Sequence, residues 1–214
     1  MNNTYTVKPI VFTSINMFAL LVCILSLTFA ACQEDNSKEL FSRMLKEKDS
    51  IQIHNLKDDI LKKYPDSKYG LFCKAEVLAL NKDNIGAYEL YSKAIELDPD
   101  FYQAYYERAD VCISLRENKK AEYDFTKAID IVGGDEILYT KRATFYRFIM
   151  HNYSKAIDDY ENALRSNPQN IVYLHMIGYL WMDLNDNAEA INVFNKALNI
   201  NPKDTVAYIM IGLN

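Results

Sequence analysis

The chain has 214 residues, enough for one domain or for one domain with a targeting segment. Half of the residues are hydrophobic and a quarter are charged, which supports a folded core and excludes a chain that is disordered by composition. The formal net charge is −5 and no basic face is evident, so nucleic-acid binding is not expected. Only six residues are Gly, while Ala, Leu, Lys and Glu are abundant, which favours helix over sheet.

An almost entirely apolar run covers residues 10–31 and follows a positive charge at Lys8. The run ends in the small residues Ala30 and Ala31, and the chain becomes polar directly after Cys32. A charged start, an apolar stretch and small residues before a polar switch are typical of a secretory signal. We therefore predict a signal peptide over residues 1–31.

The residues before Cys32 resemble a lipobox, in which a diacylglycerol is attached to the cysteine thiol, although Phe29 stands where that motif usually has Leu. The resemblance implies a lipoprotein of Gram-negative-type bacteria, held in the outer membrane through Cys32 and a tether over residues 32–37. Several acyl chains on one residue make such an anchor essentially permanent. The alternatives are an uncleaved membrane span, for which the run is long enough, and an ordinary thiol at Cys32. The pair Glu34-Asp35 resembles a surface-export signal, or simply belongs to a solvated tether.

A regular sequence period, equal to the spacing between Pro65 and Pro99, runs through the rest of the chain. Four prolines follow this period, namely Pro65, Pro99, Pro168 and Pro202. At the one position of the series that has no proline, Gly133-Gly134 provides another helix stop. Small residues keep the same beat in the first half of each repeat, at Ala75, Ala109, Ala143 and Gly178. The second halves carry Ala, an aromatic four residues later and another Ala three residues beyond it, beginning at Ala87, Ala121, Ala156 and Ala190.

This pattern resembles the tetratricopeptide repeat, and the resemblance covers about residues 68–214. It implies an all-α fold, an α-solenoid of antiparallel helix pairs in a right-handed superhelix. Small residues let the two helices of a pair approach closely, the aromatics fill the space between pairs, and proline ends the second helix. The repeats are predicted at 68–101, 102–135, 136–170 and 171–204. The third has one extra residue, which we place in the turn around residues 149–152.

Both ends of the array depart from the pattern. Residues 38–67 end in phase with the later prolines but carry Ile53 and Lys57 in the alanine and aromatic positions, and we interpret them as a degenerate hairpin that caps the array. Residues 205–214 begin a fifth repeat, with Gly212 placed one repeat period after Gly178. The sequence leaves open whether this half-repeat is a minimal cap or a truncated repeat.

No motif for catalysis, a cofactor or a metal is found, so we expect no enzyme and no cofactor. The three histidines lack partners at metal-ligand spacing. Acidic residues such as Asp158-Asp159 are expected on a solvated helix face. For Cys112 we expect a buried thiol, with a disulfide to Cys73 as the alternative, although the two should face different ways.

The remaining candidate for function is the concave surface, which the family lines with the second, fifth, ninth and twelfth residues of each first helix. The resemblance assigns partner binding here to Tyr69, Phe72, Gln103, Tyr106, Asp110, Thr140, Arg147, His175 and Tyr179. Exposed aromatics in a groove suit an extended peptide or a helix. The alternative is that Phe72 and Tyr106 pack on each other between repeats.

We therefore expect a membrane-anchored adaptor that binds another protein or peptide during envelope assembly or secretion. The alternative function is an accessory lipoprotein for nutrient uptake that holds a glycan or a peptide on its aromatic side chains. Both expectations draw on the likeness of fold and anchor, which sets only a prior for function.

Overall fold

The computed structural model describes residues 36–213 together with the single positions 22, 26, 31 and 33. Cys32 and most of the predicted signal peptide lie outside the described residues. No helix in the described part is both long and apolar enough to cross a membrane. The chain divides into two compact units, residues 1–70 and 71–214, which are treated separately below.

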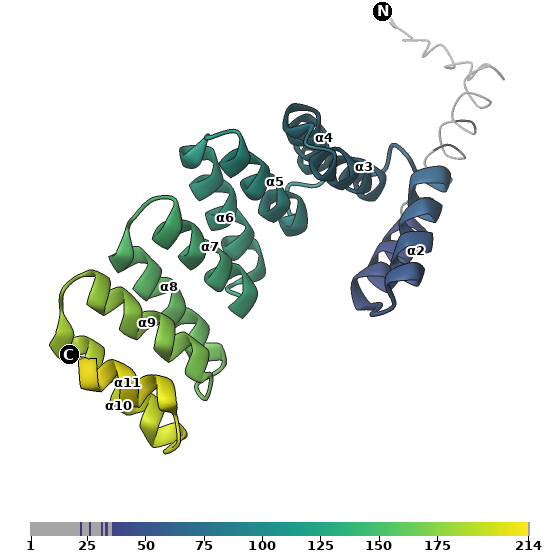
Figure 1. Cartoon of the computed structure of the whole chain (residues 1–214). Coiled ribbons are helices and arrows are strands. Elements are labelled where there is room, and N and C mark those ends of the chain that lie inside the picture. Colours follow the sequence, from purple (N-terminus) through teal and green to yellow (C-terminus); the bar gives the residue numbers. More distant parts are fainter. Residues whose placement is uncertain (1–21, 23–25, 27–30, 32, 34–35, 214) are drawn as a thin grey trace, which may run out of the picture. The chain divides into compact units, whose positions relative to one another are not determined.

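The larger unit is built from antiparallel helix pairs, and the described residues contain no strand (Figure 1). This confirms the all-α solenoid predicted from the repeat period. Each helix packs against its successor from α4 to α11, so the pairs are joined into one stack. The helices are α3 (Lys68–Leu80, which crosses the unit boundary), α4 (Asn84–Leu97), α5 (Tyr102–Ser114), α6 (Asn118–Val132), α7 (Glu136–Phe148), α8 (Tyr153–Ser166), α9 (Ile171–Asp183), α10 (Asn187–Ile200) and α11 (Thr205–Leu213).

The smaller unit contains a helical hairpin. Residues 36–46 are helical, and α2 (Ser50–Lys63) follows after a three-residue turn. The side chain of Asp49 accepts hydrogen bonds from the first amides of α2 and so caps the helix. Phe41 and Ile60 are buried in this unit, and the ring of Tyr69 stacks on Phe41 with centroids 4.7 Å apart. The predicted hairpin is therefore present, and its role as a cap stays a prediction.

The second helices end where the sequence places its helix stops. Each of α2, α4, α8 and α10 ends two residues before its proline. Helix α6 has no such proline and ends instead at Gly133, whose φ of 78° satisfies a left-handed C-cap. The turn inside the third helix pair spans residues 149–152, whereas the turns inside the other three pairs have three residues. This confirms the predicted position of the extra residue.

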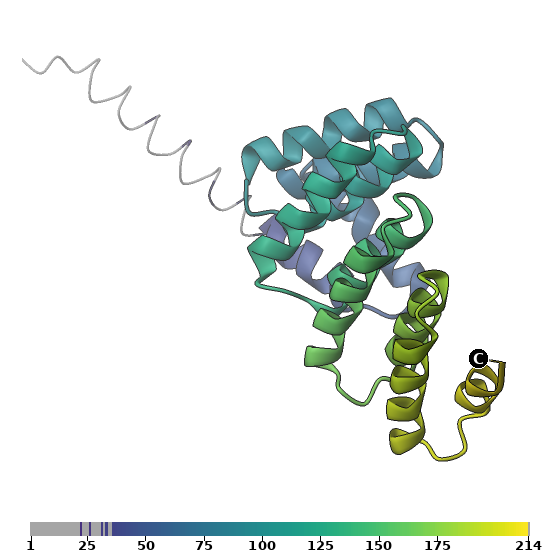
Figure 2. The same cartoon turned by 90° about the vertical axis from the view of Figure 1, so that its left-hand side faces the viewer.

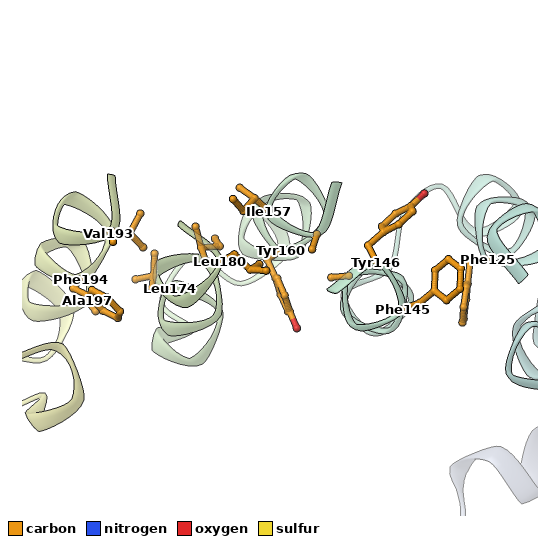
Figure 3. Close-up of a cluster of buried hydrophobic side chains, with 14 of the residues drawn as sticks. Phe125, Phe145, Tyr146, Ile157, Tyr160, Leu174, Leu180, Val193, Phe194 and Ala197 are labelled. Carbon is orange, nitrogen blue, oxygen red and sulfur yellow. The ribbon is translucent and has the colours of Figure 1, made fainter. Parts of the chain in front are cut away.

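The small residues lie where paired helices touch. The predicted alanines are all fully buried. Gly178 is closely packed, because a Cβ atom built there would lie 2.6 Å from the ring of Phe194. Close approach at these sites allows a continuous apolar core through the stack, part of which Figure 3 shows from Phe125 to Ala197.

Two buried ion pairs were not foreseen from the sequence. Arg108 donates to both oxygens of Asp124 at 2.8 and 2.7 Å, and Arg142 does the same to Asp159 at 2.8 and 2.7 Å. The expectation that Asp158-Asp159 is a solvated pair is wrong for the second residue. Asp159 is 2% exposed, whereas Asp158 is exposed. The residue just before the repeat aromatic faces inward, so its carboxylate needs a partner.

Each arginine also reaches back to the preceding helix pair. Arg108 donates to the hydroxyl of Ser92 at 2.9 Å, and Arg142 donates to the hydroxyl of Thr126 at 3.0 Å. Burial raises the pKa of Asp124 and Asp159, although the guanidinium hydrogen bonds act against that rise. These clusters join successive repeats as well as the two helices within each repeat.

The cysteines Cys73 and Cys112 are both buried thiols. Burial raises the pKa of the Cys112 thiol to about 11, so the group is protonated at neutral pH. The predicted buried thiol at Cys112 is confirmed.

Candidate partner-binding groove

A hollow of about 230 Å³ lies between α5, α6 and α7, and we call it the α5–α7 groove. Residues of α5 and α7, the first helices of their pairs, supply most of its wall. Its lining is Asp110, Ile113, Phe125, Lys141, Thr144, Phe145, Phe148 and Ile149. The floor is apolar and buried at Phe125 and Phe145, while the rim carries polar and charged groups.

The charged part of the rim is a partly exposed ion pair. The Lys141 ammonium lies 3.4 Å from the Asp110 carboxylate, and the two side chains are 46% and 43% exposed. The same ammonium lies 5.3 Å from the ring centroid of Tyr106. Burial acts to lower the pKa of Lys141, but the charge and hydrogen bonding of Asp110 and Tyr106 together outweigh burial and raise the pKa. The groove therefore offers one fixed cation and one fixed anion side by side.

Exposed apolar side chains occur on the first helices α7 and α9, and one of them, Phe148, lines the groove. Phe148 and Ile137, both on α7, are 61% and 64% exposed, and Val172 at the start of α9 is 59% exposed. Apolar side chains that gather beside a hollow are more informative than single ones scattered over a surface. Phe148 thus adds an exposed ring beside the charged pair at the rim of the groove.

The predicted groove residues divide into two groups. Asp110 lines the α5–α7 groove, and Tyr106 contacts its Lys141. Gln103 and Thr140 are half-buried on the same helices, and the hydroxyl of Thr140 donates to its own helix at the carbonyl of Ile137. These four side chains remain candidates for partner contact.

The other predicted residues pack against or bind side chains of neighbouring helices, and the first two of them are buried. Tyr69 and Phe72 are 6% and 3% exposed, so neither presents an aromatic surface to a partner. Phe72 packs against Tyr91 and Phe101, with ring centroids 5.5 and 5.3 Å apart. Tyr106 packs on Phe125, with ring centroids 6.4 Å apart.

The predicted residues on α7 and α9 mostly serve as links between helices. Arg147 reaches Asp183 on α9 at 3.3 Å. The Nε2 atom of His175 lies 2.6 Å from a carboxylate oxygen of Asp204, the residue before α11. Tyr179 packs its half-buried ring on Phe194, with centroids 5.8 Å apart. His175 in particular positions the last helix, a role that the repeat pattern did not indicate.

Sequence reasoning missed Lys141 and Phe148, the residues that give the groove its cation and its largest exposed ring. Both lie outside the four positions by which the family lines its concave surface. Lys141 lies 31 residues after Asp110, which is short of the repeat period, so the repeat pattern gave no signal for this pair.

Among the described residues, no group of three or more His, Cys, Asp or Glu side chains is arranged to hold a metal ion. The α5–α7 groove combines a cation, an anion and apolar side chains.

Models of the tetratricopeptide repeat match residues 90–123 and 172–204. No curated protein matches the chain by sequence. Among solved structures, a crystal structure of MamA is 24% identical, with 71% of this chain and 88% of that chain covered at a TM-score of 0.58. YrrB, described as a TPR protein with an unusual peptide-binding site, is 19% identical, with 73% and 80% covered at a TM-score of 0.57.

A tetratricopeptide repeat protein from Parabacteroides merdae ATCC 43184 is 22% identical, with 67% of this chain and 57% of that chain covered at a TM-score of 0.58. At these identities the likeness establishes the fold alone. Tetratricopeptide repeats typically act as non-catalytic scaffolds for proteins or peptides. The family models thus match two segments of this chain, and the solved structures share its fold.

Proposed function

We propose that this protein is a membrane-anchored adaptor that holds a segment of another protein in the α5–α7 groove. The observation that carries the proposal is the groove itself, where the exposed ring of Phe148 stands beside the Asp110–Lys141 pair. A segment with an apolar side chain next to a charged one fits this surface, because the rings supply contact area and the ion pair fixes orientation.

The anchor in this proposal is the lipid on Cys32, and the site of action is the cell envelope, with the outer membrane favoured. Its support is the Ala30-Ala31-Cys32 boundary in the sequence. Envelope assembly or secretion is the setting in which an anchored, non-catalytic scaffold would act.

The groove is tested by capture of partners from membranes with the full-length protein, followed by mass spectrometry. Phe148→Ala should weaken capture by about 2–4 kcal/mol, since an exposed aromatic at the centre of an interface carries much of the affinity. Tyr123→Ala is the matched control, because this ring is 56% exposed but lies on a second helix, α6. Equal capture by the folded Phe148→Ala protein would refute the groove. Heat on titration with oligosaccharides would instead favour the nutrient-binding alternative.

The anchor is tested separately. Cys32→Ala should release the protein from membranes or leave its signal segment uncleaved. An intact mass equal to that of the unmodified polypeptide 32–214 would contradict lipidation.

A further inference from the structure

A second hollow, of about 400 Å³, lies among α8, α9 and α10, and we call it the α8–α10 hollow. Helix α9 packs against both α8 and α10, which are green to yellow-green in Figure 2. These two helices also pack against α7 and α11, so the hollow is bounded by helices that have a neighbour on either side. Its floor is apolar, since Leu174 is buried and Leu164 and Ile200 are half-buried.

Tyrosine rings hold the equivalent position in two earlier repeats. The place of Leu174 in α9 is taken by Tyr105 in α5 and by Tyr139 in α7. Tyr105 is 8% exposed, and the Arg108 guanidinium lies over its ring, 5.5 Å from the centroid. The Tyr139 hydroxyl reaches the loop before α7, where a Cβ atom added at Gly134 would lie 2.8 Å from it. Leucine has no ring and is shorter than tyrosine, so α9 leaves open the space beside its own preceding loop.

The rim of the α8–α10 hollow carries a surplus of positive charge. Arg165 in the last turn of α8 and Lys196 on α10 line it together with one anion, Glu161, and all three are exposed. Within the part of the chain that the structure describes, neither cation forms an ion pair, whereas Arg108 and Arg142 each bind a carboxylate. The chain as a whole has a formal net charge of −5, so this surplus is local. It favours a partner that is negatively charged where it meets the hollow.

We propose that the α8–α10 hollow binds an acidic segment of a partner protein that inserts an aromatic side chain. The ring lies against Leu174 and takes the place that Tyr105 and Tyr139 fill in their own repeats. Carboxylates beside the ring in the partner segment meet Arg165 and Lys196 at the rim. An aromatic side chain in an apolar hollow supplies most of the affinity, and the charges at the rim select the partner and speed its association.

This site is separate from the α5–α7 groove. The two share no lining residue, and they come from different helices of the stack. The groove pairs its cation with its own anion, Lys141 with Asp110, whereas Arg165 and Lys196 are available to a carboxylate from outside. The inference therefore does not depend on the proposed function of the α5–α7 groove.

The probes are fluorescein-labelled peptides with one tyrosine, phenylalanine or tryptophan between pairs of aspartates, titrated into the full-length protein and followed by anisotropy. The wild-type protein should bind at least one of them saturably, and a peptide with alanine in place of the ring should bind about tenfold more weakly or worse. Leu174→Tyr should weaken binding by a similar factor, because its own ring fills the hollow. The melting temperature should not fall, since tyrosine stands at this position in α5 and α7.

Matched lysines test the charge without touching the floor of the hollow. Lys196→Glu should weaken binding and reduce its dependence on salt, because the cation is replaced by an anion. Lys93→Glu is the control, since Lys93 is exposed and holds the same place in the repeat on α4. Phe148→Ala in the α5–α7 groove should leave peptide binding unchanged, so the two proposals fail separately.

Four outcomes would overturn the inference. The first two are the absence of saturable binding of every aromatic peptide to the wild-type protein, and full binding to the folded Leu174→Tyr protein. The third is an equal loss with Lys93→Glu and Lys196→Glu, which would show attraction to the whole chain instead of to the hollow. The fourth is a doubling of mass with concentration that Leu174→Tyr abolishes, which would assign the hollow to a second copy of the chain.

Discussion

The pairs α5–α6 and α7–α8 differ from the pair α9–α10 at the same two places in the repeat. The residue before the small residue of the first helix is Arg108 or Arg142 in the former pairs and Ile177 in the latter. The residue before the aromatic of the second helix is an aspartate in both former pairs and Val193 in the latter. Ile177 and Val193 are 2% and 5% exposed, so the same buried space holds either an ion pair or two aliphatic side chains.

This difference shows that the backbone of the repeat does not require charge at these positions. A buried ion pair is often no more stabilising than well-packed apolar residues of similar volume, although the loss of one partner is costly. The arginines do something that Ile177 does not, because each also binds a hydroxyl of the preceding pair, at 2.9 Å for Arg108 and 3.0 Å for Arg142. We infer that the ion pairs stabilise the contact between successive repeats, whereas the aliphatic pair Ile177–Val193 contributes only to packing within its own repeat.

The largest effect is expected from breaking one ion pair. Asp159→Ala leaves the Arg142 guanidinium buried without its carboxylate, which should lower the free energy of unfolding by about 3–5 kcal/mol. Urea denaturation followed by circular dichroism measures the change. Asp158→Ala, at the exposed neighbouring residue, is the control and should change it by less than about 0.5 kcal/mol. Similar effects at both residues would contradict the buried placement of Asp159.

Transplanting the aliphatic pair sharpens the comparison. Arg142→Ile combined with Asp159→Val reproduces the α9–α10 combination in α7–α8, and the double variant should be neutral or stabilised by about 1–4 kcal/mol. The same urea measurement on the double variant and on Asp159→Val alone gives the coupling between the two sites. A double variant as unstable as Asp159→Val would show that the repeat depends on the charges after all.

A smaller loss is expected from Gly178→Ala in α9. Alanine favours helix over glycine by about 1 kcal/mol, yet its Cβ would press on the Phe194 ring and cost about 1–3 kcal/mol of overpacking. Thermal unfolding should therefore show a net loss. Gly212→Ala, where the space is open, should raise the melting temperature slightly. A rise for both variants would mean that the ring yields easily.

The smallest effect is a dependence on pH at the last helix. Burial acts to raise the pKa of Asp204, but the hydrogen bonds with His175 and the amides of Ala207 and Val206 outweigh it and lower the pKa. A depressed carboxyl pKa adds stability above the unfolded-state value of about 4, and that stability is lost as pH falls through the folded-state pKa. The hydrogen-exchange protection factors of the α11 amides should therefore fall in acid.

Asp204→Asn should remove this acid dependence of α11. The raised pKa values of Asp124 and Asp159 act in the opposite direction, since such groups lose stability as pH rises through the folded-state pKa. Acid should consequently loosen α11 before it loosens α5–α8. An equal fall of the protection factors in both regions would contradict this difference.

The sequence by itself determined the repeat and its boundaries. Local backbone preferences account for the helix stops at Pro99 and Gly133. Strict periodicity accounts for the small residues and for the extra residue in turn 149–152. Both signals can be read from the sequence alone. Within the groove, the sequence predicted Asp110 on a first helix, because the helical phase determines which side of a helix a residue faces.

Only the tertiary structure decided which polar and aromatic side chains are buried or paired within the fold. Asp159 is buried because Arg142 reaches it from another helix, and Phe72 is buried because Tyr91 and Phe101 close over it. His175 is held by Asp204, which is distant in the sequence. Pairings of this kind depend on distances between helices and on the length of each side chain. The repeat pattern predicts on which face of its helix a residue lies, but it does not predict which side chains of other helices that face contacts.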